Sequence, residues 1–280
     1  MTTMICPICK GTLSIEVFKH PDRKEKSFEF RRCSKCMHFW RETPWELSNP
    51  TKHFAGVSYT NIEYVRRYDK LHMPIFKHVL DLANALRPKE PRLIVDFGCS
   101  CGKLMEIFRD CGWNIMGIEI SPTAQKTLGD RGLPWVSCLE EMKLPFGSVD
   151  IVTMLDCLYY LPDPVSTLKQ IRLYLKPGGS VILRNPTRAG LIQLLLSFSK
   201  SKAFHPYLWA DHIHEFSCRS TCYTLQEAGF ADIRFIREKR FPRRLKFEIL
   251  HRTLQALDYM TFHRYDLSLS WLVSAIGIKV

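Results

Sequence analysis

One stretch of the chain combines a strand pattern, a glycine loop and a helix pattern. An apolar run at 93–95 is followed by Asp96 and then by two glycines, Gly98 and Gly102. Apolar residues then recur at helical spacing as far as position 111. A short apolar run indicates a buried strand, and the helical spacing indicates an amphipathic helix. Strand, glycine loop and helix in this order are typical of a doubly wound α/β nucleotide-binding fold.

The two glycines have a physical reason in such a loop. A Cβ at Gly98 or Gly102 would obstruct either a tight turn or the close approach of a ligand to the backbone. Taken alone, the motif is also compatible with an ordinary turn between a strand and a helix. The next predicted strand, at 114–119, ends in Glu119. In this fold a carboxylate there accepts hydrogen bonds from ribose hydroxyls, which favours the nucleotide-binding interpretation.

Strands and helices continue to alternate after this point. Apolar runs predict further strands at 134–138, 151–155, 180–184, 231–237 and 267–279. Ser121-Pro122 and Asp163-Pro164 each predict a helix start, because a capping side chain precedes a proline at the first helical position. Ser217 predicts the cap of another helix. The pattern therefore predicts an α/β domain with a mainly parallel sheet.

Two Cys-x-x-Cys pairs precede this domain. They consist of Cys6, Cys9, Cys33 and Cys36. This spacing brings four thiolates within tetrahedral reach of one Zn²⁺ ion, and alternating positions at 12–19 and 27–32 predict two short strands between the pairs. The pattern is that of a zinc ribbon. A closed four-thiolate site has no open position, so the predicted zinc is structural, and it would supply much of the folding free energy of so small a module.

The pattern divides the chain into three parts. We expect a zinc ribbon at 1–40, a linker with leading helices at 41–90 and the main domain at 91–280. A helical stripe covers 61–86, with Pro74 as a break or kink. The segment 187–216 interrupts the sheet as a substrate lid, and its apolar stretch is too short to cross a bilayer. Contact with a membrane surface is the alternative for that stretch.

The amino-acid composition indicates the cellular compartment and the kinds of partner that the protein could bind. Of the 280 residues, 46% are hydrophobic and 24% are charged, as in ordinary soluble proteins. The N-terminus lacks the features of a secretory signal, and 11 cysteines then indicate reduced thiols and metal ligation, so we expect a cytoplasmic protein without a transmembrane segment. The net charge of +12 fits nucleic acid, an anionic membrane or a phosphorylated substrate. The basic clusters at 19–35 and 234–246 do not alternate with aromatic residues, which favours solvated faces.

Several short motifs follow one another across residues 92–240. In order they read Val-Asp-Phe-Gly-x-x-x-Gly, Gly-Ile-Glu-Ile-Ser, Leu-Glu-Glu-Met, Val-Asp-Ile-Val, Leu-Pro-Asp-Pro and Leu-Lys-Pro-Gly-Gly. In this order they resemble the class I S-adenosylmethionine (SAM)-dependent methyltransferases. The resemblance implies a Rossmann-like, seven-stranded, doubly wound sheet whose last strand is antiparallel. An NAD-binding protein is a weaker match, because its loop favours Gly-x-Gly-x-x-Gly.

The resemblance also implies the residues that bind SAM. They are Asp96, Gly98, Gly102, Glu119, Ile120, Glu140, Glu141 and Asp156. In the family, the acid matched by Asp96 holds the glycine loop and the methionine end of SAM, and the acid matched by Glu140 meets the adenine amino group. The alternative for Glu140 and Glu141 is a solvated acidic pair at a helix start, where carboxylates suit the helix dipole.

Two residues are candidates for catalysis. Relatives often carry a His-x-x-x-Phe-Ser segment beside the substrate, and His212 matches its histidine. A histidine can take a proton from the acceptor as the methyl group moves, although a structural histidine before a helix cap is the alternative. Tyr159 and Tyr160 stand where many relatives have Glu-His. Tyr160 is therefore a weaker candidate for acid–base chemistry, and the two phenols would instead suit an aromatic or sugar-sized pocket.

These observations predict an enzyme that transfers a methyl group from SAM to a small-molecule, sugar or lipid-linked acceptor. Two alternatives stay open. One is an RNA methyltransferase that uses the ribbon and the basic clusters to hold phosphates. The other is an interaction protein that has the same fold but no catalytic activity.

Overall fold

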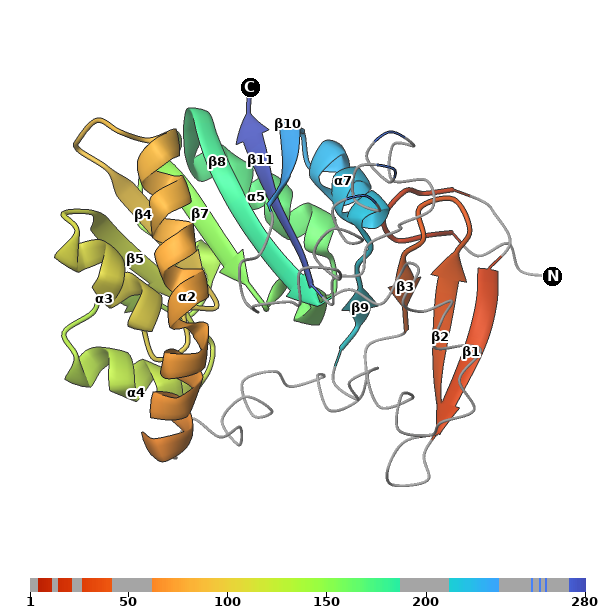
Figure 1. Ribbon diagram of the computed structural model, residues 1–280, viewed down its shortest axis with the longest axis horizontal. Helices are drawn as coiled ribbons and strands as arrows, with labels where there is room; N and C mark the ends of the chain where they lie inside the picture. Colours follow the sequence, from red (N-terminus) through yellow and green to blue (C-terminus); the bar gives the residue numbers. More distant parts are fainter. Residues whose placement is uncertain are drawn as a thin grey trace.

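The computed structural model describes residues 5–11, 15–21, 27–41, 62–186, 212–236 and 272–280, with the single positions 253, 257 and 260. Within these ranges a larger sheet has helices on both faces, and a smaller sheet lies beside it (Figure 1). The strands of the larger sheet are β4 (Leu93–Phe97), β5 (Asn114–Ile118), β6 (Trp135–Val136), β7 (Val149–Leu155), β8 (Leu175–Pro186), β10 (Phe230–Ile236) and β11 (Leu272–Lys279).

The larger sheet has the predicted topology. Its strand order is β10-β11-β8-β7-β4-β5-β6. The strands from β4 to β8 are parallel to one another, whereas β11 is antiparallel to both β8 and β10. The expected Rossmann-like sheet with an antiparallel last strand is therefore confirmed. Strand order reverses between β4 and β7, and ligands of open α/β sheets bind at the carboxyl ends of the strands at such a point.

Helices cover both faces of this sheet. The α-helices are α2 (Ile62–Leu86), α3 (Lys103–Asp110), α4 (Pro122–Asp130), α5 (Pro164–Tyr174) and α7 (Cys218–Glu227), and the 3₁₀ helices are η3 (Leu139–Glu141) and η4 (Leu158–Tyr160). α2 continues as one helix past Pro74, so the sequence-based alternative of a break is wrong. The predicted caps are present, since the side chains of Ser121, Asp163 and Ser217 accept hydrogen bonds from the first turns of α4, α5 and α7.

The core explains why the central strands are almost entirely apolar. Ile151 and Ile182 pack against α2 and α3 on one face, whereas the next residues, Val152 and Leu183, pack with residues of α5 and α7 on the other. Successive side chains of a strand point to opposite faces, so a strand covered on both faces needs apolar residues throughout. The carboxyl ends of these strands are therefore held between two apolar layers.

The smaller sheet contains the cysteine module. Its order is β1 (Ile15–Pro21), β2 (Ser27–Cys33), β3 (Phe39–Trp40) and β9 (His214–Glu215), and every neighbouring pair is antiparallel. β1 and β2 correspond to the two predicted short strands. β9 comes from the end of the segment 187–216 and completes this sheet beside β3 (Figure 1).

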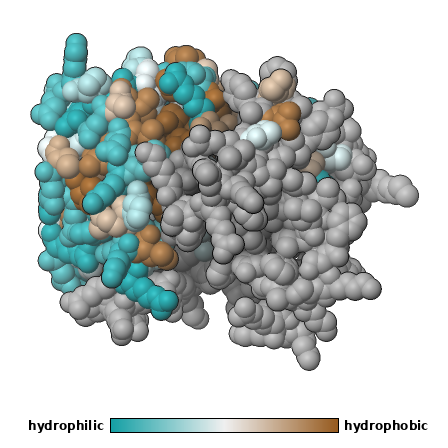
Figure 2. Space-filling model, viewed as in Figure 1, coloured by the Kyte–Doolittle hydropathy of each residue, from teal (hydrophilic) through white to brown (hydrophobic). Residues whose placement is uncertain are grey.

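The face seen in Figure 2 has mainly hydrophilic residues at its outer edge and hydrophobic residues further in, toward α2 and the strands beside it. Within the described ranges, none of the helices combines the length and the hydrophobicity that crossing a bilayer requires. The apolar stretch predicted as a lid helix lies outside the described residues. Most of the side chains in the two basic clusters also lie outside them.

Candidate active site and metal centre

The loop between β4 and α3 holds both predicted glycines in the left-handed region of backbone space. Their φ angles are 74° at Gly98 and 81° at Gly102. A Cβ on Gly98 would lie 2.9 Å from the Cβ of Cys157, and a Cβ on Gly102 would lie 2.4 Å from the side chain of Leu133. Turn conformation and packing against neighbouring side chains therefore require glycine at both positions, whether or not a ligand approaches.

Asp96 lies at the carboxyl end of β4 and is buried. Its Oδ1 accepts a hydrogen bond from the hydroxyl of Thr153 at 2.7 Å. Burial raises the pKa of Asp96 to about 7, the bond from Thr153 opposes this change, and repulsion from Glu119 adds to it. The carboxyl group is thus poised to change charge near neutral pH. A cation bound beside it would favour the charged form.

Glu119 follows β5 and bridges to the glycine loop. Its Oε2 accepts a hydrogen bond from the backbone N–H of Ser100 at 2.8 Å, and its Oε1 accepts one from the backbone N–H of Ser121 at 2.7 Å. Burial raises the pKa of Glu119, whereas these backbone donors lower it. A carboxylate offers about four acceptor positions, so these two bonds leave capacity for hydroxyl donors.

The other residues expected to bind SAM lie on the same side of the sheet. Ile120 is half-buried beside Glu119, while Glu140 and Glu141 are exposed in η3. Oε2 of Glu141 accepts a hydrogen bond from the backbone N–H of Ser137 at 2.9 Å. The exposure of Glu140 is compatible with both sequence-based interpretations, a contact to adenine and a solvated acid.

Asp156 directly follows β7, at the point where strand order reverses. It is a non-glycine residue with a positive φ of 59°. Its carboxylate pairs with Arg184, whose side chain is buried, and its backbone N–H donates to the carbonyl of Arg184 at 2.7 Å. Residues in this backbone region cluster at functional sites, where the surrounding structure holds them in place. The ion pair therefore fixes the ends of β7 and β8 relative to each other.

His212 and Glu215 form a buried pair at β9. Nδ1 of His212 and Oε1 of Glu215 are 2.9 Å apart, and the side chains are 4% and 0% exposed. A carboxylate beside Nδ1 holds the proton on that nitrogen, so Nε2 is the nitrogen that can accept a proton. The arrangement has the geometry of a carboxylate-oriented general base.

The two tyrosines of η4 surround this histidine. The ring centroid of Tyr159 is 3.9 Å from that of His212, and Tyr160 meets the same ring edge-on at 5.4 Å. The backbone N–H of Ile213 also donates to the carbonyl of Tyr159 at 3.0 Å. Burial raises the pKa of Tyr159, which keeps its phenol neutral. The fold thus brings both predicted catalytic candidates, His212 and Tyr160, to one place.

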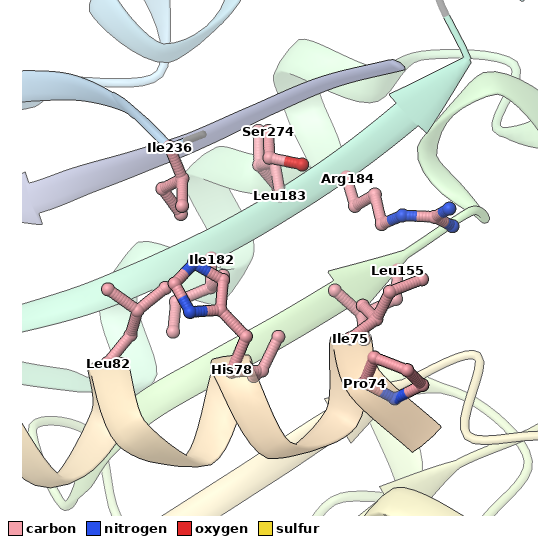
Figure 3. A pocket seen from close by; sticks show the side chains of 11 residues that line it. Pro74, Ile75, His78, Leu82, Leu155, Ile182, Leu183, Arg184, Ile236 and Ser274 are labelled. Atoms are coloured by element: carbon pink, nitrogen blue, oxygen red, sulfur yellow. The ribbon is translucent and has the colours of Figure 1, made fainter. Parts of the chain in front are cut away.

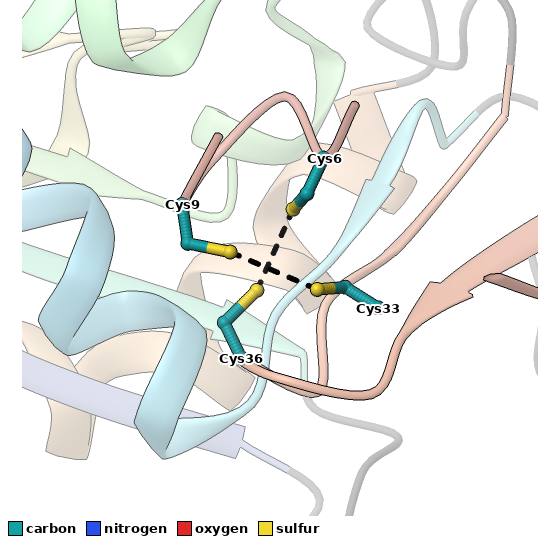
Figure 4. A group of neighbouring side chains, drawn as sticks. All are labelled: Cys6, Cys9, Cys33 and Cys36. Carbon is teal, nitrogen blue, oxygen red and sulfur yellow. Dashed lines mark hydrogen bonds between the residues drawn. The ribbon is translucent and has the colours of Figure 1, made fainter. Parts of the chain in front are cut away.

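The four cysteines of the module converge on one point (Figure 4). They are Cys6, Cys9, Cys33 and Cys36, all buried, and their Sγ atoms lie within 4.8 Å of one another. The Sγ atoms of Cys6 and Cys36 are 3.6 Å apart, and those of Cys9 and Cys33 are 3.7 Å apart. A zinc tetrahedron with bonds of about 2.3 Å has sulfur–sulfur edges of roughly 3.8 Å. The thiols therefore have the spacing that Zn²⁺ requires.

The electrostatics of this cluster also fit a cation. Hydrogen bonding to Cys6, burial and repulsion from its neighbours raise the pKa of Cys36. Burial raises the pKa of Cys9 to about 11. Four thiolates cannot gather in a buried site without compensating positive charge, and a bound metal ion deprotonates coordinating thiols. The residues present therefore fit Zn²⁺.

A hollow lies between α2 and the strands beside it (Figure 3). Its lining consists of Pro74, Ile75, His78, Val79, Leu82, Leu155, Ile182, Leu183, Arg184, Ile236 and Ser274. Most of these side chains are apolar. Arg184 brings a cation to the hollow from the end of β8, where it pairs with Asp156. Through Arg184 the hollow is linked to Asp156.

Two residues of the site were not predicted from the sequence. Glu215 lies beside His212, and Arg184 lies beside Asp156. The carboxylate three positions after His212, inside an otherwise apolar and aromatic segment, was a usable signal for the first. Arg184 had a weaker signal, namely a charged residue at the end of an apolar strand run.

Comparison with protein families gives one match over most of the larger sheet. Residues 68–234 match a family model described as a methyltransferase domain. The chain is 28% identical over 124 residues to the ubiquinone biosynthesis O-methyltransferase of Ralstonia nicotianae, which is 41% of this chain and 52% of that protein. It is 25% identical over 143 residues to the C-methyltransferase NovU of Streptomyces niveus, 49% of this chain and 32% of that protein. The chain thus spans about half, or less, of these relatives.

Solved structures share the fold at low sequence identity. A SAM-dependent methyltransferase of Archaeoglobus fulgidus superposes with a TM-score of 0.54 at 16% identity, covering 77% of this chain and 99% of that one. Phosphoethanolamine N-methyltransferase 2 of Haemonchus contortus, in a complex with S-adenosylhomocysteine, gives a TM-score of 0.55 at 15% identity, covering 94% of this chain and 71% of that one. At such identities the likeness shows a common fold.

Proposed function

We propose that this chain, which belongs to the methyltransferase domain family, transfers a methyl group from SAM to a small-molecule acceptor. One observation carries the proposal: the glycine loop, Asp96 and Glu119 meet at the carboxyl ends of β4 and β5. A carboxyl group that changes charge near pH 7 suits the ammonium of the methionine end. A carboxylate one strand away suits the ribose hydroxyls.

The bound cofactor supplies a methyl group that its positive sulfur already makes electrophilic. The chain's own residues would hold the two reactants in line and exclude water. Glu215 would keep the proton of His212 on Nδ1, and Nε2 would take the proton that the acceptor loses. Tyr159 and Tyr160 would enclose the reacting groups with aromatic surface.

The acceptor that we propose is a small molecule with an acidic O–H or C–H group and an apolar part. The names of two relatives, an O-methyltransferase and a C-methyltransferase, support a reaction in which the acceptor loses a proton. The rings of Tyr159 and Tyr160 around His212 support the apolar part. A sugar or a lipid-linked acceptor is included in this class.

We also propose that Cys6, Cys9, Cys33 and Cys36 hold a structural Zn²⁺ ion. The sulfur spacing and the burial of all four thiols support this assignment. Because the four thiolates complete the coordination, the ion would stabilise the module and take no part in the chemistry.

Titration calorimetry of the full chain with SAM and with S-adenosylhomocysteine tests the cofactor assignment. The wild-type chain should bind both, and Glu119→Ala should weaken binding at least tenfold because the ribose loses its acceptor. Asp110→Asn removes an exposed carboxylate of α3 and should leave the affinity unchanged. A wild-type chain that binds neither compound would refute the proposed function.

Transfer of labelled methyl groups from SAM to panels of phenols, sugars and lipid-linked glycans tests the proposed acceptor class and the proposed base. With an acceptor that is turned over, His212→Ala should lower kcat by about 10²–10⁴ while SAM affinity is unchanged. Glu215→Gln should have a smaller effect on kcat, since the base remains but its orientation weakens. Full activity in His212→Ala would show that this histidine is structural.

A further inference from the structure

The segment that carries the proposed base is part of the cysteine module. β9 pairs with β3, so that Trp40 lies opposite His214 and Phe39 lies opposite Glu215. The hydrogen bonding continues one residue further, where the backbone N–H of Arg41 donates to the carbonyl of Ile213 at 3.1 Å. The base is therefore attached to strands that are distant from it in sequence.

Side chains add three connections between this segment and the module. Nε of the buried Arg41 donates to the carbonyl of His212 at 2.8 Å. The hydroxyl of Ser217 donates to the carbonyl of Cys36 at 3.1 Å. Nε2 of His38 and Nδ1 of His214 are 2.9 Å apart in a fully buried contact. These connections lie on both sides of Glu215, so the module holds the His212–Glu215 segment at both ends.

The cysteine pairs determine where these connections lie. Cys33 ends β2, Cys36 follows in the turn, and β3 begins at Phe39. The turn is closed by hydrogen bonds from the backbone N–H of Met37 to Cys33 and from that of Cys33 to His38, both at 2.8 Å. The turn that would bind the metal ion is therefore continuous with the strand on which β9 rests. Since modules of this size depend on their metal ion for folding, the contacts from β3 to β9 depend on the ion as well.

We infer that the four-cysteine metal centre positions the proposed catalytic base, and that Arg41 is the positioning residue that joins the two. The catalytic role of His212 in this inference rests on the proposed function. The structural link itself holds independently of any reaction. Zn²⁺ in this protein would then control methyl transfer through β3 and β9 while lying outside the cofactor site.

Hydrogen exchange followed by mass spectrometry tests the link on the full chain. Zinc is removed with a thiol reagent and a chelator, and Zn²⁺ is then added back. Peptides that cover 212–217 should exchange at least tenfold faster without zinc and recover with it. Peptides that cover 93–118 should not change, and the affinity for SAM should stay within about twofold. Equal protection of 212–217 with and without zinc would overturn the inference.

A pair of variants tests Arg41 with the metal ion in place. Arg41→Gln should keep its zinc but speed exchange at 212–217 several-fold, because the bond to the carbonyl of His212 is lost. Its His212 imidazole ¹⁵N shifts should also move away from those of the Nδ1–H form that Glu215 holds. Lys10→Gln, an exposed change in the same module, should alter neither. Unchanged exchange and unchanged imidazole shifts in Arg41→Gln would refute its positioning role.

The two halves of the proposal fail in different ways. If zinc-loaded chain does not bind SAM, the proposed function fails, whatever the exchange data show. If it binds SAM but zinc has no effect on 212–217, the proposed function stands and the link between metal ion and base is wrong.

Discussion

The cofactor side and the base side of the site are built in different ways. Asp96 and Thr153 stand on adjacent parallel strands that are covered on both faces by helices. The His212–Glu215 pair stands at β9, a strand of two residues that pairs with another strand of two residues. Regular parallel pairing holds the first. The second depends on a two-residue pairing and on polar contacts to the cysteine module, although Phe216 beside it packs in the same apolar cluster as Val95.

This difference indicates that one active site can contain two levels of local stability. Elements held by long, regular strand pairing open only with global unfolding, whereas elements held by a short pairing open at lower cost. The cofactor side should therefore tolerate changes in the cysteine module. The base side should not, and each prediction below tests that asymmetry.

The largest effect should come from Cys36→Ser. Zinc sites of this kind supply the folding free energy of their module, so the variant should lose its metal ion and the order of the smaller sheet. Zinc content by mass spectrometry should fall from about one ion per chain to less than about a tenth. Cys111→Ser, at an exposed cysteine, is the matched control. SAM affinity that falls together with the metal content would remove the asymmetry between the two sides.

Gly98→Val should damage the cofactor side without affecting the module. A branched side chain at a φ of 74° is strained and would also meet the side chain of Cys157. We expect a loss of SAM affinity of about 100-fold or more by calorimetry, with zinc content unchanged. Gly147→Val has a similar φ of 70° but open space around its Cβ, so it separates strain from local contact. Near-normal SAM affinity in Gly98→Val would contradict the role of this loop.

The contrast between the two sides is also a contrast in what sequence can predict. The strand, the glycine loop, the acid after β5 and the helix caps depend on neighbours in sequence, and local patterns predict such features. The pairing of β3 with β9 depends on residues that are distant in sequence, such as His38 and His214. Strands of two residues have no periodicity to detect, so this pairing could not be predicted.

Other contacts of the site could not be predicted from the sequence for the same physical reason. The close packing of Cys157 against the position of Gly98 and the ion pair between Asp156 and Arg184 form between strand ends that meet only in the folded sheet. The sequence identified Asp156 as a site residue but contained nothing that specified its partner. Local chemistry is thus predictable from local residues, whereas the contacts that orient it come from topology.

The pH dependence of SAM binding tests the charge on the cofactor side. The pKa of Asp96 is about 7 in the folded chain against 3.8 for the ordinary group, because of burial. If the charged carboxylate meets the ammonium of SAM, binding expels a proton below pH 7, so affinity should rise up to about tenfold per pH unit until pH 7 and then level off. Calorimetry of Asp96→Asn should show weak binding without this rise. A parallel rise in the variant would assign it to another group.

The same group makes a prediction about stability in the absence of SAM. Between pH about 4 and 7, folded Asp96 keeps a proton that the unfolded chain releases, so its contribution to stability falls as pH rises through this window. Denaturation curves of Asp96→Asn should show less of this fall than those of the wild-type chain. An equal fall in both would show that Asp96 is not the group responsible.

The smallest effect compares two serine caps, one on each side of the site. Ser121 caps α4 and Ser217 caps α7, and replacing either with alanine should cost about 1 kcal/mol through the lost cap. Ser217 also donates to the carbonyl of Cys36, so Ser217→Ala should cost roughly 1 kcal/mol more than Ser121→Ala in urea denaturation of the zinc-loaded chain. This excess should become smaller when zinc is removed, because the carbonyl then no longer has a fixed position. The remainder reflects the stronger cap, since Ser217 accepts at 2.9 Å within a capping box and Ser121 accepts at 3.5 Å. An excess that is the same with and without zinc would mean that the contact depends on α7 alone, and that the two sides of the site are less different than their construction implies.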